Sequence, residues 1–261
     1  MDELLPNPDS ASGAPPTVRM SFFARLLNVF AIPGDVFQDV KTSPKSVANW
    51  LIPILISAVV GSLSAIVIFS QPNIQQQIKE AQAKTFDQQV KEKKITREQA
   101  DQMVAMTEKF TGPAMMKTIG VIGSSIASFV RVFWWGLVIY LIGQWFLKVR
   151  IPYLKAVEVA GLSIMIAVLG AVVALLLVVN LEKLTAGPNL GLAVKDFDMN
   201  SKGHLALGAA NIFSFWFVTV ISIGLSRLAE VPLARALFLV FGYWVLQEFL
   251  LIGIGMGQMA L

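Results

Sequence analysis

Two ionisable side chains lie deep inside apolar stretches of this chain, and their types and positions make them the first candidates for chemistry. Arg131 lies within Ser125–Phe133, and Glu248 lies within Val245–Leu251. A charge inside a bilayer costs several kcal/mol unless it is paired. Each residue lies about 24 Å along its helix, at 1.5 Å per residue, from the helix end that is expected on the same side of the membrane. The sequence therefore predicts an Arg131–Glu248 pair.

Such a pair has functional and structural interpretations. The functional ones are a proton or ion relay, or a site for an anion or a lipid headgroup. The structural one is an ion pair that fixes the register of two helices. We favour the structural interpretation, because no second carboxylate or histidine in the sequence extends a relay.

Four amide side chains are the other polar candidates inside or at the ends of the apolar stretches. They are Gln144, Gln247, Asn180 and Asn211. Hydrogen bonds between membrane helices, worth about 0.6–2 kcal/mol each, explain such residues. We predict that these amides join helices rather than bind a ligand.

These candidates must be positioned by five long apolar runs, at about 50–69, 118–147, 159–181, 205–225 and 231–257. Each reaches the roughly 20 residues that cross a hydrocarbon core about 30 Å thick. The composition agrees, with 55% hydrophobic and 15% charged residues and a mean hydropathy of +0.66. The predicted fold class is all-α, a polytopic membrane protein with a bundle of five transmembrane helices.

Several classes of function lack the residues that they need. Cysteine is absent and His204 is the single histidine, so the sequence offers neither a thiolate nor a histidine-based metal cluster. No aspartate lies in an apolar run, and no histidine lies there to act as a base. We therefore expect no catalytic residues, no cofactor and no metal, and we predict that the protein is not an enzyme. We attribute the net charge of +4 to membrane topology and expect no nucleic-acid partner.

The segment before the first run divides into a tail and an amphipathic stretch. Residues 1–18 are acidic and rich in Pro, Ser and Gly, which predicts a disordered tail ahead of a membrane domain over 19–261. Arg19–Val40 is too short and too charged to span a membrane, and Met20, Phe23, Leu27 and Phe30 form one apolar face. We predict an interfacial helix whose Arg19 and Arg25 meet lipid headgroups. We expect Pro33-Gly34 to end this helix and Asp35 to cap the next.

The polar region 70–117, between the first two runs, predicts a helical hairpin on the membrane surface. An apolar stripe among Gln, Lys and Asp marks its first helix. Thr96 and Gln99 have the spacing of a capping box, which begins a second helix that runs to about Phe110. The turn is expected near Lys93–Ile95.

Small residues recur every four positions in three of the runs. These ladders are Gly120, Ser124 and Ser128; Ser163, Ala167 and Ala171; and Gly253 and Gly257. A spacing of four places each set on one helix face, where another backbone can approach closely. Packing within the bundle is preferred to dimerisation as the explanation.

Charges in the short loops predict an orientation. The basic residues of these loops fall on one side of a five-span bundle; they are Arg19, Arg25, Lys41, Lys45, Lys148, Arg150, Lys155, Arg227 and Arg235. Basic residues of short loops mark the cytoplasmic side. The N-terminus is therefore predicted in the cytoplasm, with the hairpin and the C-terminus outside.

Two groups of residues resemble a known family. Leu26-Leu27-Asn28-Val29-Phe30, Ile32-Pro33-Gly34-Asp35-Val36-Phe37 and Trp50-Leu51-Ile52-Pro53 resemble the start of a prokaryotic Yip1 domain. Ile223-Gly224-Leu225-Ser226 and Pro232-Leu233-Ala234-Arg235-Ala236 are similar to that family's junction between its fourth and fifth helices. The resemblance covers about Phe22 to Gly257. The third run lacks the internal proline common in the family, and the hairpin is an insertion relative to compact members.

The resemblance implies five helices with a cytoplasmic N-terminus. Eukaryotic members bind Rab-type GTPases, but the segments typical of them have no clear match here, so that binding is not predicted. The preferred function is non-catalytic: a Yip1-like protein that organises membrane, or a membrane subunit or adaptor for partner proteins. Expected partners are the lipid bilayer and either other proteins or further copies of the chain, in a bacterial cytoplasmic (inner) membrane. The alternative is a transporter or permease subunit for an ion or lipid that uses the Arg131/Glu248 pair.

Overall fold

The computed structural model describes residues 19–198 and 201–254, and of residues 107–111 it describes the backbone alone. Five helices of the described part are long and apolar enough to cross a membrane. They are α3 (Ala48–Ile68), α6 (Pro113–Leu141) with its π-helical end η2 (Ile142–Leu147), α7 (Tyr153–Leu181), α9 (Ile212–Ala229) and α10 (Leu233–Gly253). The predicted all-α bundle of five spans is confirmed.

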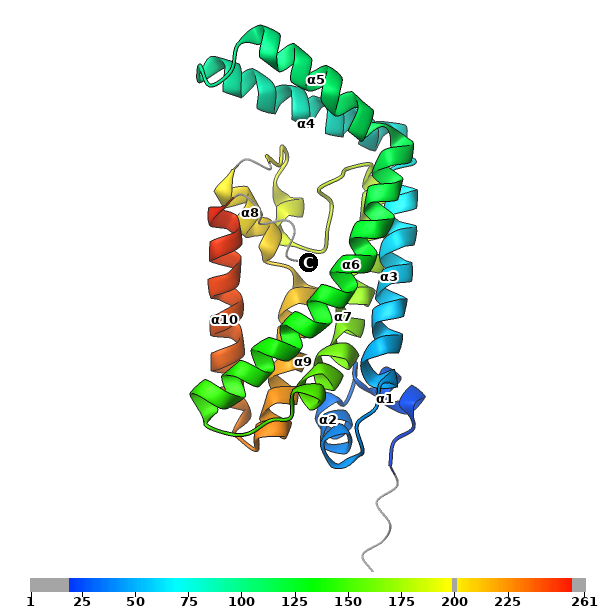
Figure 1. Cartoon of the computed structure of the whole chain (residues 1–261), viewed down its shortest axis with the longest axis vertical. Coiled ribbons are helices and arrows are strands. Elements are labelled where there is room, and N and C mark those ends of the chain that lie inside the picture. Colours follow the sequence, from blue (N-terminus) through cyan, green and yellow to red (C-terminus); the bar gives the residue numbers. More distant parts are fainter. Residues whose placement is uncertain (1–18, 199–200, 255–261) are drawn as a thin grey trace, which may run out of the picture.

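The remaining helices lie at the two ends of the bundle (Figure 1). One end carries α1 (Phe22–Asn28) and α2 (Pro33–Thr42), together with the α6–α7 and α9–α10 connections. The opposite end carries α4 (Pro72–Lys91), α5 (Arg97–Thr111), the 3₁₀ helix η3 (Leu190–Ala193) and α8 (Lys202–Ala209). The loops on which the predicted orientation rests therefore share one end.

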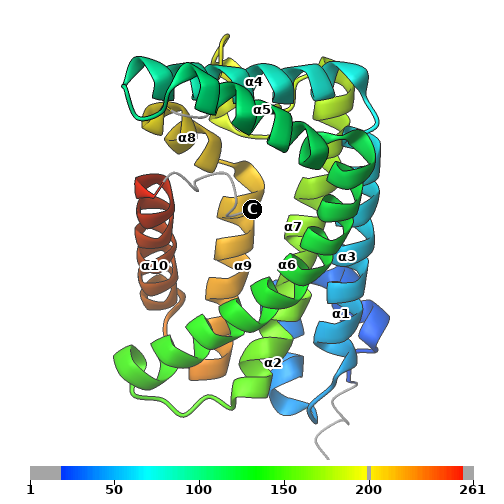
Figure 2. The ribbon, with the colours of Figure 1, turned by 45° about the horizontal axis from the view of Figure 1, so that its top comes forward.

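The hairpin forms as predicted and lies across the end of the bundle (Figure 2). Thr96 and Gln99 make both hydrogen bonds of the capping box that begins α5. Lys93 adopts a left-handed backbone, with φ of 59°, in the turn between the two helices. The start of α4 is fixed to the end of α7, because the Gln77 side chain bonds the Glu182 carbonyl (2.6 Å) and the Leu184 N–H (3.1 Å).

The small-residue ladder of α6 packs against α3. A Cβ on Gly120 would lie 2.6 Å from the Ala65 Cβ, and one on Gly61 would lie 2.8 Å from the Ser124 Cβ. The hydroxyls of Ser57 and Ser128 lie 3.0 Å apart between the same two helices. Small residues thus let the two backbones approach closely, and packing within the bundle is the observed use of this ladder.

Helix α7 is the centre of the bundle, and its first half is buried from Lys155 to Ile164. At Gly161 an added Cβ would lie 2.4 Å from the Trp50 Cα of α3. At Gly224 of α9 it would lie 2.2 Å from the Val159 side chain of α7. Glycine is required at both points, because the space of a side chain is taken by the neighbouring helix.

Among the helix boundaries that differ from the prediction, two have a cause in the local sequence. The fourth span was expected to begin at Leu205, but α8 ends at Ala209 and the span starts at Ile212. Asn211 causes the break, since its extended backbone and its Oδ1, which accepts the Phe213 N–H (2.8 Å), make it the N-cap of α9. Asp35 was expected to cap the second short helix, but Pro33 begins α2 after Ile32 and Asp35 lies inside its first turn. Part of the last predicted run, 255–257, lies outside the described residues.

The five spans differ greatly in length. Helix α9 has 18 residues and the continuous α6–η2 helix has 35. At 1.5 Å per residue these lengths are about 27 Å and 52 Å. Figure 1 shows α6 running obliquely across the bundle, in contrast to α9 and α10.

Replacing Gly161 by Ala is expected to destabilise the bundle by about 1–3 kcal/mol, the usual cost of overpacking a core. The new methyl group meets the α3 backbone, which has no flexible end to move away. Unfolding of the purified protein in mixed detergent micelles measures the effect. Gly123→Ala in α6 is the matched control, since nothing lies within 4 Å of its added Cβ; equal stabilities of the two variants would contradict this packing.

Candidate functional site

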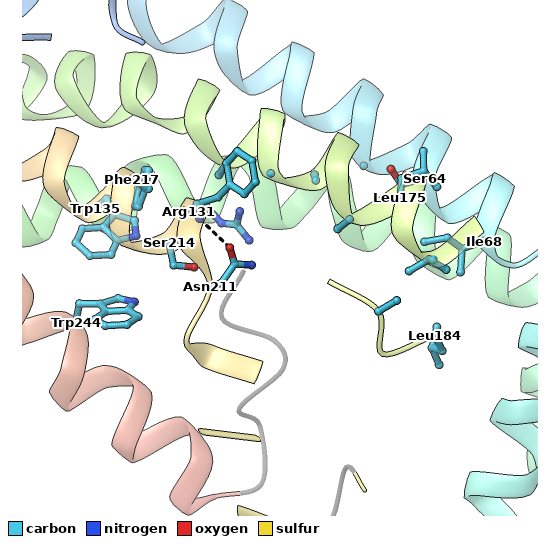
Figure 3. A pocket seen from close by; sticks show the side chains of 18 of the residues that line it. Ser64, Ile68, Arg131, Trp135, Leu175, Leu184, Asn211, Ser214, Phe217 and Trp244 are labelled. Atoms are coloured by element: carbon cyan, nitrogen blue, oxygen red, sulfur yellow. Dashed lines mark hydrogen bonds between the residues drawn. The ribbon is translucent and has the colours of Figure 1, made fainter. Parts of the chain in front are cut away.

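A cavity of about 360 Å³ lies inside the bundle and contains three of the six candidate residues. Arg131, Asn211 and Gln247 line it, with side chains from α3, α6, α7, α9 and α10. Helix α7 lines the cavity with four small residues, Ala167, Gly170, Ala171 and Ala174, and with Leu175 and Val178. Figure 3 shows Trp135, Phe217 and Trp244 at one end and Ile68 and Leu184 at the other, with Arg131 between them.

The predicted Arg131–Glu248 pair is not formed. Neither side chain takes part in an ion pair among the residues that the structure describes. Glu248 is buried (8% exposed) but is not part of the cavity lining, whereas Arg131 is half-buried in the cavity wall. Equal depth was not sufficient, because contact also requires the two side chains to lie on facing sides of their helices.

The four amides have different roles, and one of them joins two spans. Gln247 of α10 accepts a hydrogen bond from the Trp134 indole of α6 (3.4 Å), which also donates to Tyr243 (2.8 Å). Asn180 instead donates to the Leu176 carbonyl of its own helix (2.7 Å), and Asn211 caps α9. Gln144 is half-buried in the π-helical turn, and its side chain makes no hydrogen bond in the described part of the chain.

A second polar cluster lies at the end of the bundle that carries α1 and α2, and sequence reasoning missed it. Glu158 (1% exposed) pairs with Lys155 at 3.0 Å and accepts a 2.6 Å hydrogen bond from Asn49. Asn49 in turn lies 3.4 Å from an Arg25 nitrogen. Arg25 pairs with Asp39 at 2.7 Å and donates to Ser43 at 2.8 Å. The buried ion network therefore joins α1, α2, α3 and α7, with two positive and two negative charges.

Arg25 was expected to contact lipid headgroups, and this expectation is wrong. Its side chain is buried against Asp39, so the cationic group of α1 faces the bundle instead of the bilayer surface. Lys155 is similarly turned inward and donates to the carbonyls of Val40 (2.7 Å) and Pro44 (3.2 Å). The spacing of Lys155 and Glu158, three apart at the start of an apolar run, was the available signal.

A surface ion pair adds a further link at this end. Lys41 of α2 contacts Glu230, the residue that ends α9. The hydrogen bond from Lys41, with its positive charge, lowers the pKa of the Glu230 carboxyl. A lowered folded-state pKa means that the contact contributes stability at neutral pH and loses it as the pH falls through that pKa. Glu230 is exposed, so the contribution is small.

The sequence model of the Yip1 domain family matches residues 27–255, which is most of the chain. The chain belongs to the Yip1 domain family. No curated protein and no solved structure matches it. The family resemblance inferred from the sequence is therefore confirmed, and the helical bundle described above is the fold of this Yip1 domain.

The two groups of residues that carry the Yip1 resemblance meet in space. Phe37, from the segment before the first span, is fully buried, and a Cβ added to Gly224 would lie 3.3 Å from its ring. Gly34 lies against the Arg227 side chain, since a Cβ added to this glycine would lie 3.0 Å from the guanidinium. The segment that contains α2 and the α9–α10 junction thus form one contact, although 189 positions separate Lys41 from Glu230.

The two clusters differ in how their charges are partnered. No group of three or more His, Cys, Asp or Glu residues that could hold a metal ion occurs in the described part. The buried ion network has a partner for each of its charges, whereas the Arg131 cavity presents a cation and polar groups to an open space. The cavity is accordingly the candidate binding site, and the network is a structural element.

Glu158→Gln is expected to lower the free energy of unfolding by about 3–5 kcal/mol, because it leaves Lys155 buried beside an uncharged amide. The double variant Lys155→Met/Glu158→Met is expected to be more stable than Glu158→Gln, since no unpaired charge remains. Denaturation in detergent measures both. Asp87→Asn, which breaks the exposed Arg97–Asp87 pair, is the control and is expected to cost at most about 1 kcal/mol. A Glu158→Gln effect equal to that of Asp87→Asn would contradict a buried network.

Proposed function

We propose that this multi-pass membrane protein is non-catalytic, and that it organises the membrane or acts as a membrane subunit or adaptor for partner proteins. Membership of the Yip1 family and contact of the five spans with lipid support the first part of this statement. The proposed partners, besides the bilayer, are other proteins or further copies of the chain.

The exposed face of α1 is the observation that carries this proposal. Phe23 is 73% exposed and Leu27 is 69% exposed, although both are large and apolar. The same short helix is fixed to the bundle by the buried Arg25, so the two side chains keep a defined position at the end of the spans. A fixed apolar face at that level inserts into the interface of one leaflet and displaces lipid there. Insertion into one leaflet alone is a physical means of shaping a membrane.

The α4–α5 hairpin supports the adaptor role. It lies across the end of the bundle (Figure 2), and its polar sequence keeps it out of the hydrocarbon region. Only the first part of α4 is buried against the spans, at Ile74. The rest of the hairpin therefore presents two helices to a protein partner on that side of the membrane.

Transport remains the second candidate, and one observation favours it. Arg131 lines a cavity near the middle of α6, about 27 Å from the start of that helix, where a transported ion or lipid would bind. The Arg131/Glu248 pair gives it no support, because that pair is not formed. Flux of solute or lipid in proteoliposomes that Arg131→Ala abolishes would favour transport over the non-catalytic role proposed above.

We place the chain in a bacterial cytoplasmic membrane, with the N-terminus in the cytoplasm and the C-terminus outside. The support is the charge of the short connections, which lie at the α1–α2 end of the bundle (Figure 1). The hairpin then lies outside the cytoplasm.

Single-cysteine variants test this orientation directly, because the natural chain has no cysteine. A membrane-impermeant maleimide added to intact cells (spheroplasts for a Gram-negative host) is expected to label Glu98→Cys in the hairpin. It is expected to spare Lys148→Cys in the α6–α7 connection until the membrane is permeabilised. The reverse labelling pattern would show that the orientation is inverted.

Removing the apolar face of α1 is expected to weaken membrane deformation while leaving the fold intact. The variant is Phe23→Ser/Leu27→Ser, and the measurement is tubulation or fragmentation of giant vesicles that contain the purified protein. Phe23→Leu/Leu27→Phe keeps the apolar area and serves as the control. Tubulation or fragmentation at the wild-type level in the serine variant would contradict the membrane-organising role. Thermal unfolding in detergent separates a loss of folding from a loss of function.

A further inference from the structure

The intramembrane cavity contains a cation without a counter-charge and two hydroxyls without a hydrogen-bond partner among the described residues. Arg131 has no ion-pair partner among the described residues, and the buried hydroxyls of Ser64 and Ser214 have no hydrogen-bond partner there. Asn211 uses its Oδ1 to cap α9, and its side chain lies toward Arg131 in Figure 3. Such groups are costly to leave unsatisfied in a bilayer, which points to a bound acceptor.

The charge of the cavity defines the acceptor. The guanidinium of Arg131 is always protonated and carries five N–H donors, more than a single neutral amide can satisfy. No aspartate or glutamate belongs to the lining, so the described part of the chain supplies no counter-charge there. An anionic oxygen group satisfies both requirements at once, since phosphate and carboxylate oxygens accept paired hydrogen bonds from a guanidinium.

The remaining walls define the rest of the ligand. Most lining residues are apolar, and Figure 3 shows Arg131, Asn211 and Ser214 together, with Ile68, Leu175 and Leu184 farther along. The volume of about 360 Å³ lies within the range of about 300–1,000 Å³ typical of ligand pockets. Ala171 and Ala174 have small side chains, which leave space in the cavity beside one wall. A polar anion alone would leave these walls uncovered.

We propose that this cavity binds an anionic lipid, whose phosphate or carboxylate group contacts Arg131, Asn211 and Ser214 and whose acyl chain lies along the apolar walls. Binding at this site does not depend on the membrane-organising role of α1. It adds to the proposed function a specific lipid ligand inside the bundle.

Native mass spectrometry of the full chain, purified in mild detergent and exchanged into defined lipid, tests this proposal. The probes are phosphatidylglycerol, oleate, zwitterionic phosphatidylcholine and inorganic phosphate, each added alone. We expect the protein to retain phosphatidylglycerol or oleate in preference to phosphatidylcholine. Which of the two lipids is retained identifies the anionic group as a phosphate or a carboxylate. Binding of inorganic phosphate without either lipid, or equal retention of phosphatidylcholine, would overturn the proposal.

Variants assign the binding to the cavity. Arg131→Gln is expected to reduce retention at least about tenfold, because a charge-assisted hydrogen bond is worth more than about 1.4 kcal/mol. Arg131→Lys keeps the charge and is expected to retain part of the binding. Arg235→Gln removes an exposed arginine outside the cavity and is expected to change nothing. Equal retention by Arg131→Gln and Arg235→Gln would disprove the site.

A second variant leaves every polar group in place. Ala171→Phe directs a large side chain into the cavity and is expected to exclude the acyl chain. Brominated phosphatidylglycerol or oleate gives an independent readout, since Trp135 and Trp244 line the cavity and bromine quenches indole fluorescence on contact. We expect quenching in the wild type and its loss in Ala171→Phe. Quenching that persists in Ala171→Phe and disappears in a Trp50→Phe variant would place the lipid elsewhere.

Discussion

The buried ion network is the constraint on which the arrangement of this Yip1 domain depends. Four elements meet at it, and each contributes a group that would be costly to bury alone: Arg25, Asp39, Asn49, Lys155 and Glu158. A buried charge without its partner costs more than the pair gains. The network therefore allows only those positions of α1, α2 and α3 on α7 that satisfy all of its members, and it determines where the short N-terminal helices lie.

Close packing around α7 also fixes the positions of the neighbouring helices. Gly161 admits the backbone of α3, and Gly224 admits the side chain of Val159 beside Phe37. Lipid tails are as apolar as the helix surfaces, so association in a membrane relies on such contacts and on polar groups. The two ends of the bundle differ in the contacts that hold them together. The α1–α2 end is joined by charges and glycines, whereas the cavity lies farther along the spans, toward the hairpin.

The sequence predicted the elements well and their mutual contacts poorly. Length and apolarity determine a membrane helix, so the five spans and the hairpin with its Thr96–Gln99 capping box were predictable. The prediction of an Arg131–Glu248 pair was wrong, because the depth of two residues along their helices does not determine which helix faces are in contact. The roles of Arg25 and Lys155 were missed because a basic residue near a membrane surface has two uses, lipid contact and burial in an ion pair. Tertiary placement of α2 and α7 decides between them, and no local pattern encodes it.

The break at Asn211, which makes α9 the shortest of the five spans, has a consequence for the surrounding bilayer. A helix of about 27 Å matches a thin hydrocarbon layer, whereas α6–η2 is about 52 Å long and crosses obliquely. A span longer than the hydrocarbon thickness is accommodated by tilt, so the oblique course of α6 takes up its extra length, whereas α9 has none to spare. Tilt thereby lets spans of about 27 Å and 52 Å share one hydrocarbon layer.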